Sequence, residues 1–320
     1  MTLRRCASLG LLGIAIAIGI ALPARADSVV TSPAGLSIFQ ITSGPFSGID
    51  PSDYYSAMAF DPSGNYLLLA INSGTTAQSS PQGIYEMQVD RNGDGEITGF
   101  GTPSLYATVN TTVGAVNNGV GGGLIEQSGG SLLYTTNPSN YVGSYSGGSS
   151  SLTSYTGLAP YTLGGLQYVP ASFTNNGAGL LKISTSNPQI PAPNGEWYTI
   201  ATVGGPVSGG TGGPEADSFV YALPDADSVP EPAVLIEDAS TLTLSLYGLD
   251  SQGNPTTQIG STWVASSQML NFGIARDPRL PEYLFSTADG SIWAVEEDVP
   301  EPGTLLLIGV GLLAVIARRR

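Results

Sequence analysis

A stretch of alternating oxygen-bearing side chains near residue 90 has the residue types and the spacing of an ion-binding loop. Residues 90–98 read Asp-Arg-Asn-Gly-Asp-Gly-Glu-Ile-Thr, which places side-chain oxygens at loop positions 1, 3 and 5 and a glycine at position 6. In a calcium loop the alternate residues converge on one ion, and the glycine permits the sharp turn. The sequence therefore predicts calcium as a cofactor. Its expected ligands are Asp90, Asn92, Asp94, the backbone carbonyl of Glu96, and Thr98.

The same loop also has a reading without a metal. Gly101 stands where a complete loop carries a bidentate acid, and no helical pattern flanks the segment. The segment resembles the first half of an EF-hand or dockerin loop, or the calcium turns between strands of extracellular propellers. An Asn-Gly-Asp-Gly hairpin turn that binds no metal is the alternative.

Missing residue types exclude much of enzyme chemistry. The chain has no histidine, and its one cysteine, Cys6, lies in the N-terminal segment. Ser-His-Asp triads, Cys-His pairs and zinc sites built on histidine or cysteine are therefore impossible. No catalytic residue is predicted, and the sequence favours a protein that is not an enzyme.

The charge of the chain limits its partners. Of the 10 Lys and Arg residues, three precede residue 27 and three end the chain, so residues 27–317 hold four bases against 25 acids, a net charge of −21. Binding to phosphates requires clustered bases, so nucleic acid is excluded as an expected partner. An acidic surface suits a protein that is soluble outside the cell.

The N-terminus has the organisation of a secretory signal peptide. Arg4 and Arg5 precede an apolar stretch over residues 9–22, and Ala24 and Ala26 occupy the two positions that a signal peptidase reads. We expect residues 1–26 to be a signal peptide cleaved after Ala26. The mature chain then has no thiol, so no disulfide can hold its fold.

The last twenty-two residues form a second targeting signal. A Val-Pro-Glu-Pro motif is followed by fourteen uncharged residues, 304–317, and a terminal cluster of arginines. The prolines keep the motif extended, and the apolar run forms a short transmembrane helix of about 21 Å, less than the roughly 30 Å hydrocarbon core. The arginines stay on the cytoplasmic side. A plain membrane anchor is the alternative. The sorting residues are Val299, Pro300, Glu301, Pro302, Arg318, Arg319 and Arg320.

This arrangement resembles the PEP-CTERM sorting domain, and the resemblance is limited to residues 299–320. It implies processing by an exosortase, transient anchoring in the inner membrane, and an association with exopolysaccharide at the cell surface or in an extracellular matrix. A second Val-Pro-Glu-Pro, at 229–232, lacks both the apolar helix and the arginines, so it is expected to be a turn before a strand.

Residues 27–298 are predicted to form one β-rich extracytoplasmic domain. Short apolar runs alternate with Gly, Ser, Asn and Pro turn signals, and no ten-residue stretch has clear helical periodicity. Residues 57–70 and 272–287 share one pattern, a strand ending in Asp-Pro followed by a Tyr-Leu strand. Weaker copies begin at 122, 164 and 218. The copies resemble blades of secreted β-propellers; a β-sandwich or a β-helix is the alternative. Residues 204–213 are expected to be a linker or a loop between blades.

Together these features predict an exported surface or extracellular-matrix protein that is sorted by an exosortase and associated with exopolysaccharide. The alternative is a secreted propeller-type enzyme, a metal-dependent hydrolase or lactonase acting from the central channel. Asp or Glu side chains from three or more blades at one mouth of that channel would favour the enzyme.

Overall fold

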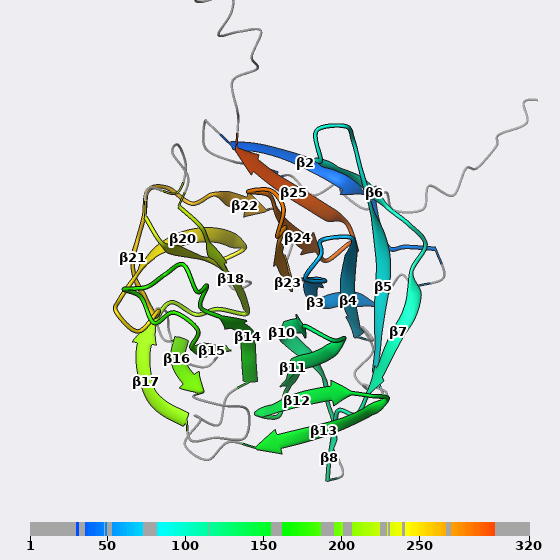
Figure 1. Cartoon of the computed structure of the whole chain (residues 1–320), viewed down its shortest axis with the longest axis horizontal. Helices are drawn as coiled ribbons and strands as arrows, with labels where there is room; N and C mark the ends of the chain where they lie inside the picture. The colour runs from blue at the N-terminus through cyan, green and yellow to red at the C-terminus, as the bar shows by residue number, and fades with distance from the viewer. Residues whose placement is uncertain are drawn as a thin grey trace, which may run out of the picture.

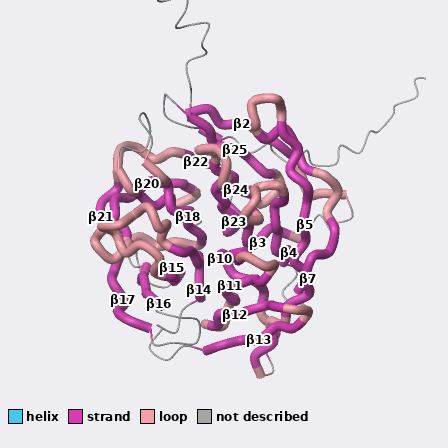
Figure 2. The backbone as a smooth tube through the Cα atoms, in the orientation of Figure 1, coloured by secondary structure: helices cyan, strands magenta, loops and turns pink. Residues whose placement is uncertain are grey.

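The fold is all-β, as the sequence predicted. The computed structural model describes residues 30–31, 36–47, 49, 53–72, 82–114, 116–154, 162–186, 195–200, 207–224, 229, 231–238, 241–266 and 270–297. This part of the chain contains 25 strands and no helix (Figure 2). No helix among these residues has the length and apolar character needed to cross a membrane. The predicted signal peptide, 1–26, and the predicted sorting signal, 299–320, lie outside the described residues.

The strands form a β-propeller of five antiparallel blades around a central axis (Figure 1), so the β-sandwich and β-helix alternatives are wrong. Blade 1 contains β3 (Tyr54–Phe60), β4 (Tyr66–Asn72), β5 (Gln82–Arg91), β6 (Ile97–Phe100) and β7 (Ser104–Val109). Blade 2 contains β10 (Gly119–Gln127), β11 (Ser131–Asn137), β12 (Tyr141–Ser146) and β13 (Ser149–Ser154). Blade 3 contains β14 (Thr162–Tyr168), β15 (Leu181–Ser186), β16 (Gly195–Ile200) and β17 (Val207–Gly213).

Blades 4 and 5 are completed by strands from the N-terminal end. Blade 4 contains β18 (Ser218–Ala222), β19 (Ala233–Asp238), β20 (Thr243–Leu249), β21 (Pro255–Gln258) and β22 (Val264–Ser266), and β1 (Val30–Thr31) pairs with β22. Blade 5 contains β23 (Leu270–Arg276), β24 (Tyr283–Thr287) and β25 (Ile292–Glu297), and β2 (Leu36–Thr42) pairs with β25. The N-terminal segment therefore closes the ring. A small hairpin of β8 (Thr112–Val113) and β9 (Val116–Asn117) lies outside the blades.

Strands inside the blades are apolar on both faces because each blade is packed between two others. In β4, Leu67 and Leu69 belong to the apolar cluster shared with blade 5, whereas Leu68 and Ala70 belong to the cluster shared with blade 2. This alternation follows from the two-residue period of a strand. The core accordingly consists of five apolar clusters, one at each blade boundary.

Buried hydroxyl groups connect the inner strands of neighbouring blades. Thr135 of β11 accepts a hydrogen bond from the backbone N–H of Gly123 (3.0 Å) and donates to the carbonyl of Gly164 in blade 3 (2.8 Å). Ser184 of β15 repeats the arrangement, because it accepts from Gly165 (2.8 Å) and donates to a backbone carbonyl next to blade 4 (2.9 Å). The register of β10 and of β14 shifts close to these glycines. The hydroxyls thus satisfy polar backbone groups that the irregular ladders leave unpaired.

All five repeats noted in the sequence fall on innermost strands and the strands that follow them. The copies at 57, 122, 164, 218 and 272 lie in β3, β10, β14, β18 and β23, which surround the axis. The glycine-rich segment 204–213 was expected to be a linker or a loop between blades, and the structure differs from this. Its residues 207–213 form β17, the outer strand of blade 3, so the segment is not a linker between domains.

Candidate functional site at the axial mouth

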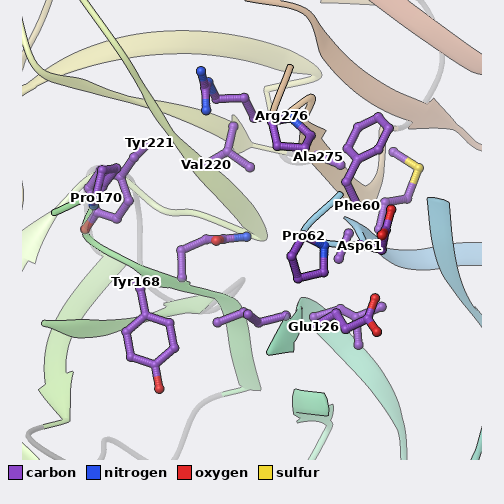
Figure 3. A pocket seen from close by; sticks show the side chains of 16 residues that line it. Phe60, Asp61, Pro62, Glu126, Tyr168, Pro170, Val220, Tyr221, Ala275 and Arg276 are labelled. Carbon is purple, nitrogen blue, oxygen red and sulfur yellow. The ribbon is translucent and has the colours of Figure 1, made fainter. Parts of the chain in front are cut away.

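A cavity of about 240 Å³ opens where the C-terminal ends of the five innermost strands converge. Every blade contributes to its wall, and Figure 3 shows the side chains around it. Because propeller strands meet only at the axis, this is the place where all five blades can contact one ligand. The polar residues of the wall are Asp61 from the β3–β4 turn, Glu126 from β10, Gln167 and Tyr168 from β14, Tyr221 from β18 and Arg276 from β23.

Glu126 is the carboxyl group of the wall that has one oxygen without a hydrogen-bond partner among the described residues. Its Oε1 accepts a hydrogen bond of 2.8 Å from the hydroxyl of Tyr106. Its Oε2 is buried and has no hydrogen-bond partner among the described residues. Burial raises the pKa of Glu126, the hydrogen bond from Tyr106 lowers it, and the charges of Asp61 and Glu86 raise it further, for a net increase.

Asp61 is committed to the turn that follows β3. Its Oδ1 accepts from the backbone N–H of Tyr66 at 2.7 Å, and its Oδ2 accepts from the backbone N–H of Ser63 at 3.0 Å. Burial alone would raise the pKa of Asp61, but the hydrogen bonds from Ser63 and from the turn backbone outweigh burial and lower it. Asp61 is therefore an ionised structural carboxylate at the rim of the cavity.

Arg276 brings a positive charge to the wall from blade 5. Its Nε is buried without a hydrogen-bond partner among the described residues. Figure 3 shows Arg276 and Glu126 on different sides of the cavity. The hydroxyl of Tyr168, a residue 37% exposed, accepts a 3.2 Å hydrogen bond from the amide of Gln127. The remaining bases of the domain, Arg91, Lys182 and Arg279, do not line this cavity.

These groups suit a ligand that both donates and accepts hydrogen bonds. Glu126, Gln167, Arg276 and Tyr168 line a cavity whose other residues are mostly apolar, and such a mixed wall is the kind that binds a sugar. Among the described residues, acidic side chains reach the wall from two blades, through Asp61 and Glu126, whereas three would favour the enzyme.

The structure places the predicted calcium residues at the end of β5 (Asp90), in the turn that follows, and at the start of β6 (Thr98). The side-chain oxygen of Asn92 accepts from the backbone N–H groups of Asp94 and Glu96, both at 3.0 Å, and its amide donates to Oε2 of Glu96 at 2.6 Å. The hydroxyl of Thr98 donates to the carbonyl of Asp90 at 3.2 Å. In this conformation Asn92 closes a hairpin. Among the described residues, no group of three or more Asp, Glu, His or Cys could hold a metal ion.

The sequence did not single out Glu126, Gln167 or Arg276. Each stands at the end of an innermost strand, just before the turn, and that repeated position is the signal that could have found them. Trp197 and Trp263 are buried in the core, so neither indole ring is available to stack on a sugar. The sorting residues Val299, Pro300, Glu301, Pro302, Arg318, Arg319 and Arg320 lie outside the described part of the chain.

The comparisons with known proteins identify the C-terminal segment. A five-bladed propeller with an axial cavity defines the body, and residues 298–320 match the PEP-CTERM protein-sorting motif. The protein thus carries a C-terminal, membrane-anchoring signal for export and exosortase processing. None of the curated proteins compared with the chain matches it.

Several solved structures are similar to the body at low identity. The PQQ domain of pyranose dehydrogenase from Coprinopsis cinerea is 8% identical with a TM-score of 0.48, covering 85% of this chain and 98% of its own. The soluble aldose sugar dehydrogenase from Escherichia coli is 11% identical with a TM-score of 0.42, covering 80% and 87%. A chain of the mitotic checkpoint complex is 11% identical with a TM-score of 0.44, covering 93% and 98%. Similarity at this level says nothing about activity.

Proposed function

We propose that this protein is a noncatalytic component of the cell surface or extracellular matrix that associates with exopolysaccharide by holding a saccharide unit in the axial mouth. The observation that carries the proposal is that Glu126, Gln167 and Arg276, from three different blades, line one cavity. Sugar hydroxyls can donate to the carboxylate and accept from the other two. Tyr168 adds an exposed ring at the rim.

Binding of the exopolysaccharide of the producing cell tests this proposal. Titration calorimetry with oligosaccharides from that polymer should show binding to the intact protein and a loss of at least tenfold in affinity in Arg276→Met or Glu126→Gln, about 1.4 kcal/mol. Arg279→Met is the matched control, because this exposed arginine belongs to the same blade and lies outside the cavity. Equal affinities for Arg276→Met and Arg279→Met would contradict the assignment of the site.

A second candidate function, glycoside hydrolysis, is favoured by one observation. Two carboxyl groups of the same wall have pKa values moved in opposite directions, up for Glu126 and down for Asp61. Such a pair can divide the roles of acid and base. Against it, both oxygens of Asp61 are occupied within its own turn. Release of reducing ends from the polymer, abolished by Glu126→Gln, would establish the enzyme in place of the binding protein.

Calcium binding at residues 90–98 is a separate proposal. The acidic side chains and their spacing support it. The hydrogen bonds of Asn92 oppose it, because this side chain would have to leave the turn to coordinate an ion. A calcium-dependent rise in melting temperature that disappears when Asp90 and Asp94 are changed to Ala would support the site. Identical melting of the intact protein with calcium and with a chelator would remove it.

The route to the surface is proposed in finer steps. Signal peptidase cleaves after Ala26, the C-terminal helix at 304–317 anchors the chain transiently in the inner membrane, and exosortase processing delivers it to the cell surface or the medium. N-terminal sequencing of the exported protein tests the first step. Neutral replacements of Arg318, Arg319 and Arg320 should disturb anchoring and processing, and unchanged maturation in a host with its exosortase would contradict the scheme.

A further inference from the structure

Charge is distributed very unevenly around the propeller. The 88 residues from Gln127 to Pro214 contain one acid, Glu196, and one base, Lys182. The rest of the domain, residues 27–126 and 215–298, contains 23 acids and three bases, a net charge of −20. This nearly uncharged span, residues 127–214, covers the outer strands of blade 2 and all of blade 3, which are neighbours in the ring. One side of the molecule is therefore neutral and the other strongly acidic.

Even the two charged residues of the span are not free on its surface. Lys182 is buried and bonded to neutral oxygens. The carboxylate of Glu196 accepts a hydrogen bond from the hydroxyl of Tyr198. The outermost strands β13 and β17 lie at the rim of the ring (Figures 1 and 2), and they contain only Ser, Thr, Gly, Leu and Val. We call these two strands the neutral rim.

The neutral rim presents two open sheet edges. Among the described residues β13 pairs only with β12, and β17 pairs only with β16. An outer strand exposes a row of N–H and C=O groups that can pair with another strand, and proteins usually protect such an edge with charges or prolines. Neither strand has one. Three serines of β13, among them Ser149 and Ser154, are exposed.

We propose that the neutral rim is the surface through which two copies of this chain associate, edge strand to edge strand. The charge distribution selects this partner. Two copies approaching through blades 1, 4 or 5 would bring their acidic halves together, and the Coulomb repulsion would oppose contact. Approach through blades 2 and 3 keeps the acidic halves apart and lets the open edges pair. The inference rests on export of the folded domain and not on the sugar site at the mouth.

Acidic substitutions at the rim test the proposal. Sedimentation velocity of the exported protein, purified from producing cells, should show a monomer–dimer equilibrium whose dissociation constant rises at least tenfold in the double variant Ser154→Asp with Ser208→Asp. Both serines are exposed members of the outer strands. Added salt should strengthen the wild-type dimer, because it screens repulsion between the acidic halves and has little to screen at the interface.

The matched control is Thr257→Asp, which adds the same kind of charge to β21, an exposed edge strand of the acidic half. This variant should associate like wild type. Equal weakening by Thr257→Asp and by the rim variant would mean that total charge, and not the rim, sets association. Monomers at every concentration would overturn the proposal. If the wild type stays monomeric and the rim variant loses binding to a neutral glucan, the rim binds a glycan and not a second copy, which would also overturn it. Circular dichroism and melting of each variant separate these results from unfolding.

Discussion

Two blade boundaries bury a basic side chain, and they treat its charge differently. Between blades 5 and 1, Arg91 forms an ion pair of 2.5 Å with the buried Asp277. Between blades 3 and 4, Lys182 donates to the hydroxyl of Thr199 at 2.6 Å and to the side-chain oxygen of Asn254, both neutral acceptors. The first boundary pairs a buried charge directly with another charge, whereas the second bonds it to neutral oxygens and only the charge of Asp250 acts on it in addition. The difference decides how the stability of each boundary responds to the loss of a partner and to a change of pH.

The ion-paired boundary also contains an excess of carboxyl groups. Glu282 follows Asp277 in the same turn and is almost fully buried. Burial raises the pKa of Glu282 to about 8, and the charges of Glu296 and Asp277 add to the increase, against Arg91 and the backbone N–H of Ile97. At this boundary the carboxyl group of Glu282 therefore stays protonated up to about pH 8. Lys182 is the corresponding group at the other, because burial lowers its pKa to about 8.

Removing the charge of Asp277 should have the largest effect on stability. In Asp277→Asn the guanidinium of Arg91 stays buried, retaining its bonds to the carbonyls of Gly95 (2.7 Å) and Gly64 (2.9 Å) but losing its counter-charge. Breaking a buried pair from one side costs about 3 kcal/mol. We expect denaturant unfolding to show that loss.

Asp61→Asn is the matched control, since Asp61 occupies the equivalent Asp-Pro turn of blade 1 but forms no ion pair among the described residues. It should lose only about 1 kcal/mol. Adding Arg91→Met to Asp277→Asn should restore part of the stability, because no unpaired charge then remains. Equal losses for Asp61→Asn and Asp277→Asn would show that the ion pair contributes nothing beyond the turn.

These two turns also show what the sequence could and could not predict. The repeated Asp-Pro marked the ends of two innermost strands correctly, because a hairpin is closed by residues that are near one another in the chain. The backbone N–H of Asp61 bonds to Tyr66 at 2.9 Å, and that of Asp277 bonds to Glu282 at 2.8 Å. What each carboxylate does beyond its turn depends on the neighbouring blade. Asp277 meets Arg91, 186 residues away in the chain, and local patterns cannot predict that distant contact.

Ring closure and the axial site escaped prediction for the same reason. Strand β2 is recognisable as apolar, but its pairing with β25 joins Leu36 to Glu297 across the whole domain. Glu126 and Arg276 come from blades 2 and 5 and become neighbours of one cavity only when the ring closes. The loop at 90–98 is recognisable in the sequence because its predicted ligands are close together in the chain. Contiguous motifs are visible in a single sequence, whereas sites assembled from several blades are not.

The ion-paired boundary should make stability fall as pH rises. The folded-state pKa of Glu282 is raised from 4.5 to about 8, so its contribution is complete below pH 4.5 and is lost between there and about pH 8. In Glu282→Gln this slope should be much smaller. Melting temperatures measured across that range check the prediction, and Glu86→Gln, a change outside the boundary, should keep the wild-type slope. A parallel decline in the wild type and Glu282→Gln would assign it to other groups.

The boundary of Lys182 should respond in the opposite direction and at higher pH. The folded-state pKa of Lys182 is lowered from 10.5 to about 8, so the unfolded chain binds more protons between these values and stability should rise there with pH. The stability of Lys182→Met should not change with pH in this window. At neutral pH this variant should be about 1 kcal/mol less stable than the wild type, because Asn254 loses a hydrogen-bond donor. Together the two boundaries place a minimum of stability near pH 8. A wild-type curve that declines steadily through pH 10 would contradict this pairing.

The smallest effect is expected where a boundary contact is exposed. Arg279 of blade 5 donates to the carbonyl of Ser63 at 2.7 Å and to the side chain of Asn65 at 2.6 Å, so it crosses the same boundary as Arg91 in the opposite direction. It is exposed and its acceptors are neutral, so water replaces them readily when the side chain is removed. Arg279→Met should therefore cost about 0.5 kcal/mol in denaturant unfolding, far less than Asp277→Asn. A loss as large as that of Asp277→Asn would contradict this. The boundary between blades 5 and 1 would then differ from the boundary of Lys182 in its hydrogen bonds between blades, and not in its buried charge.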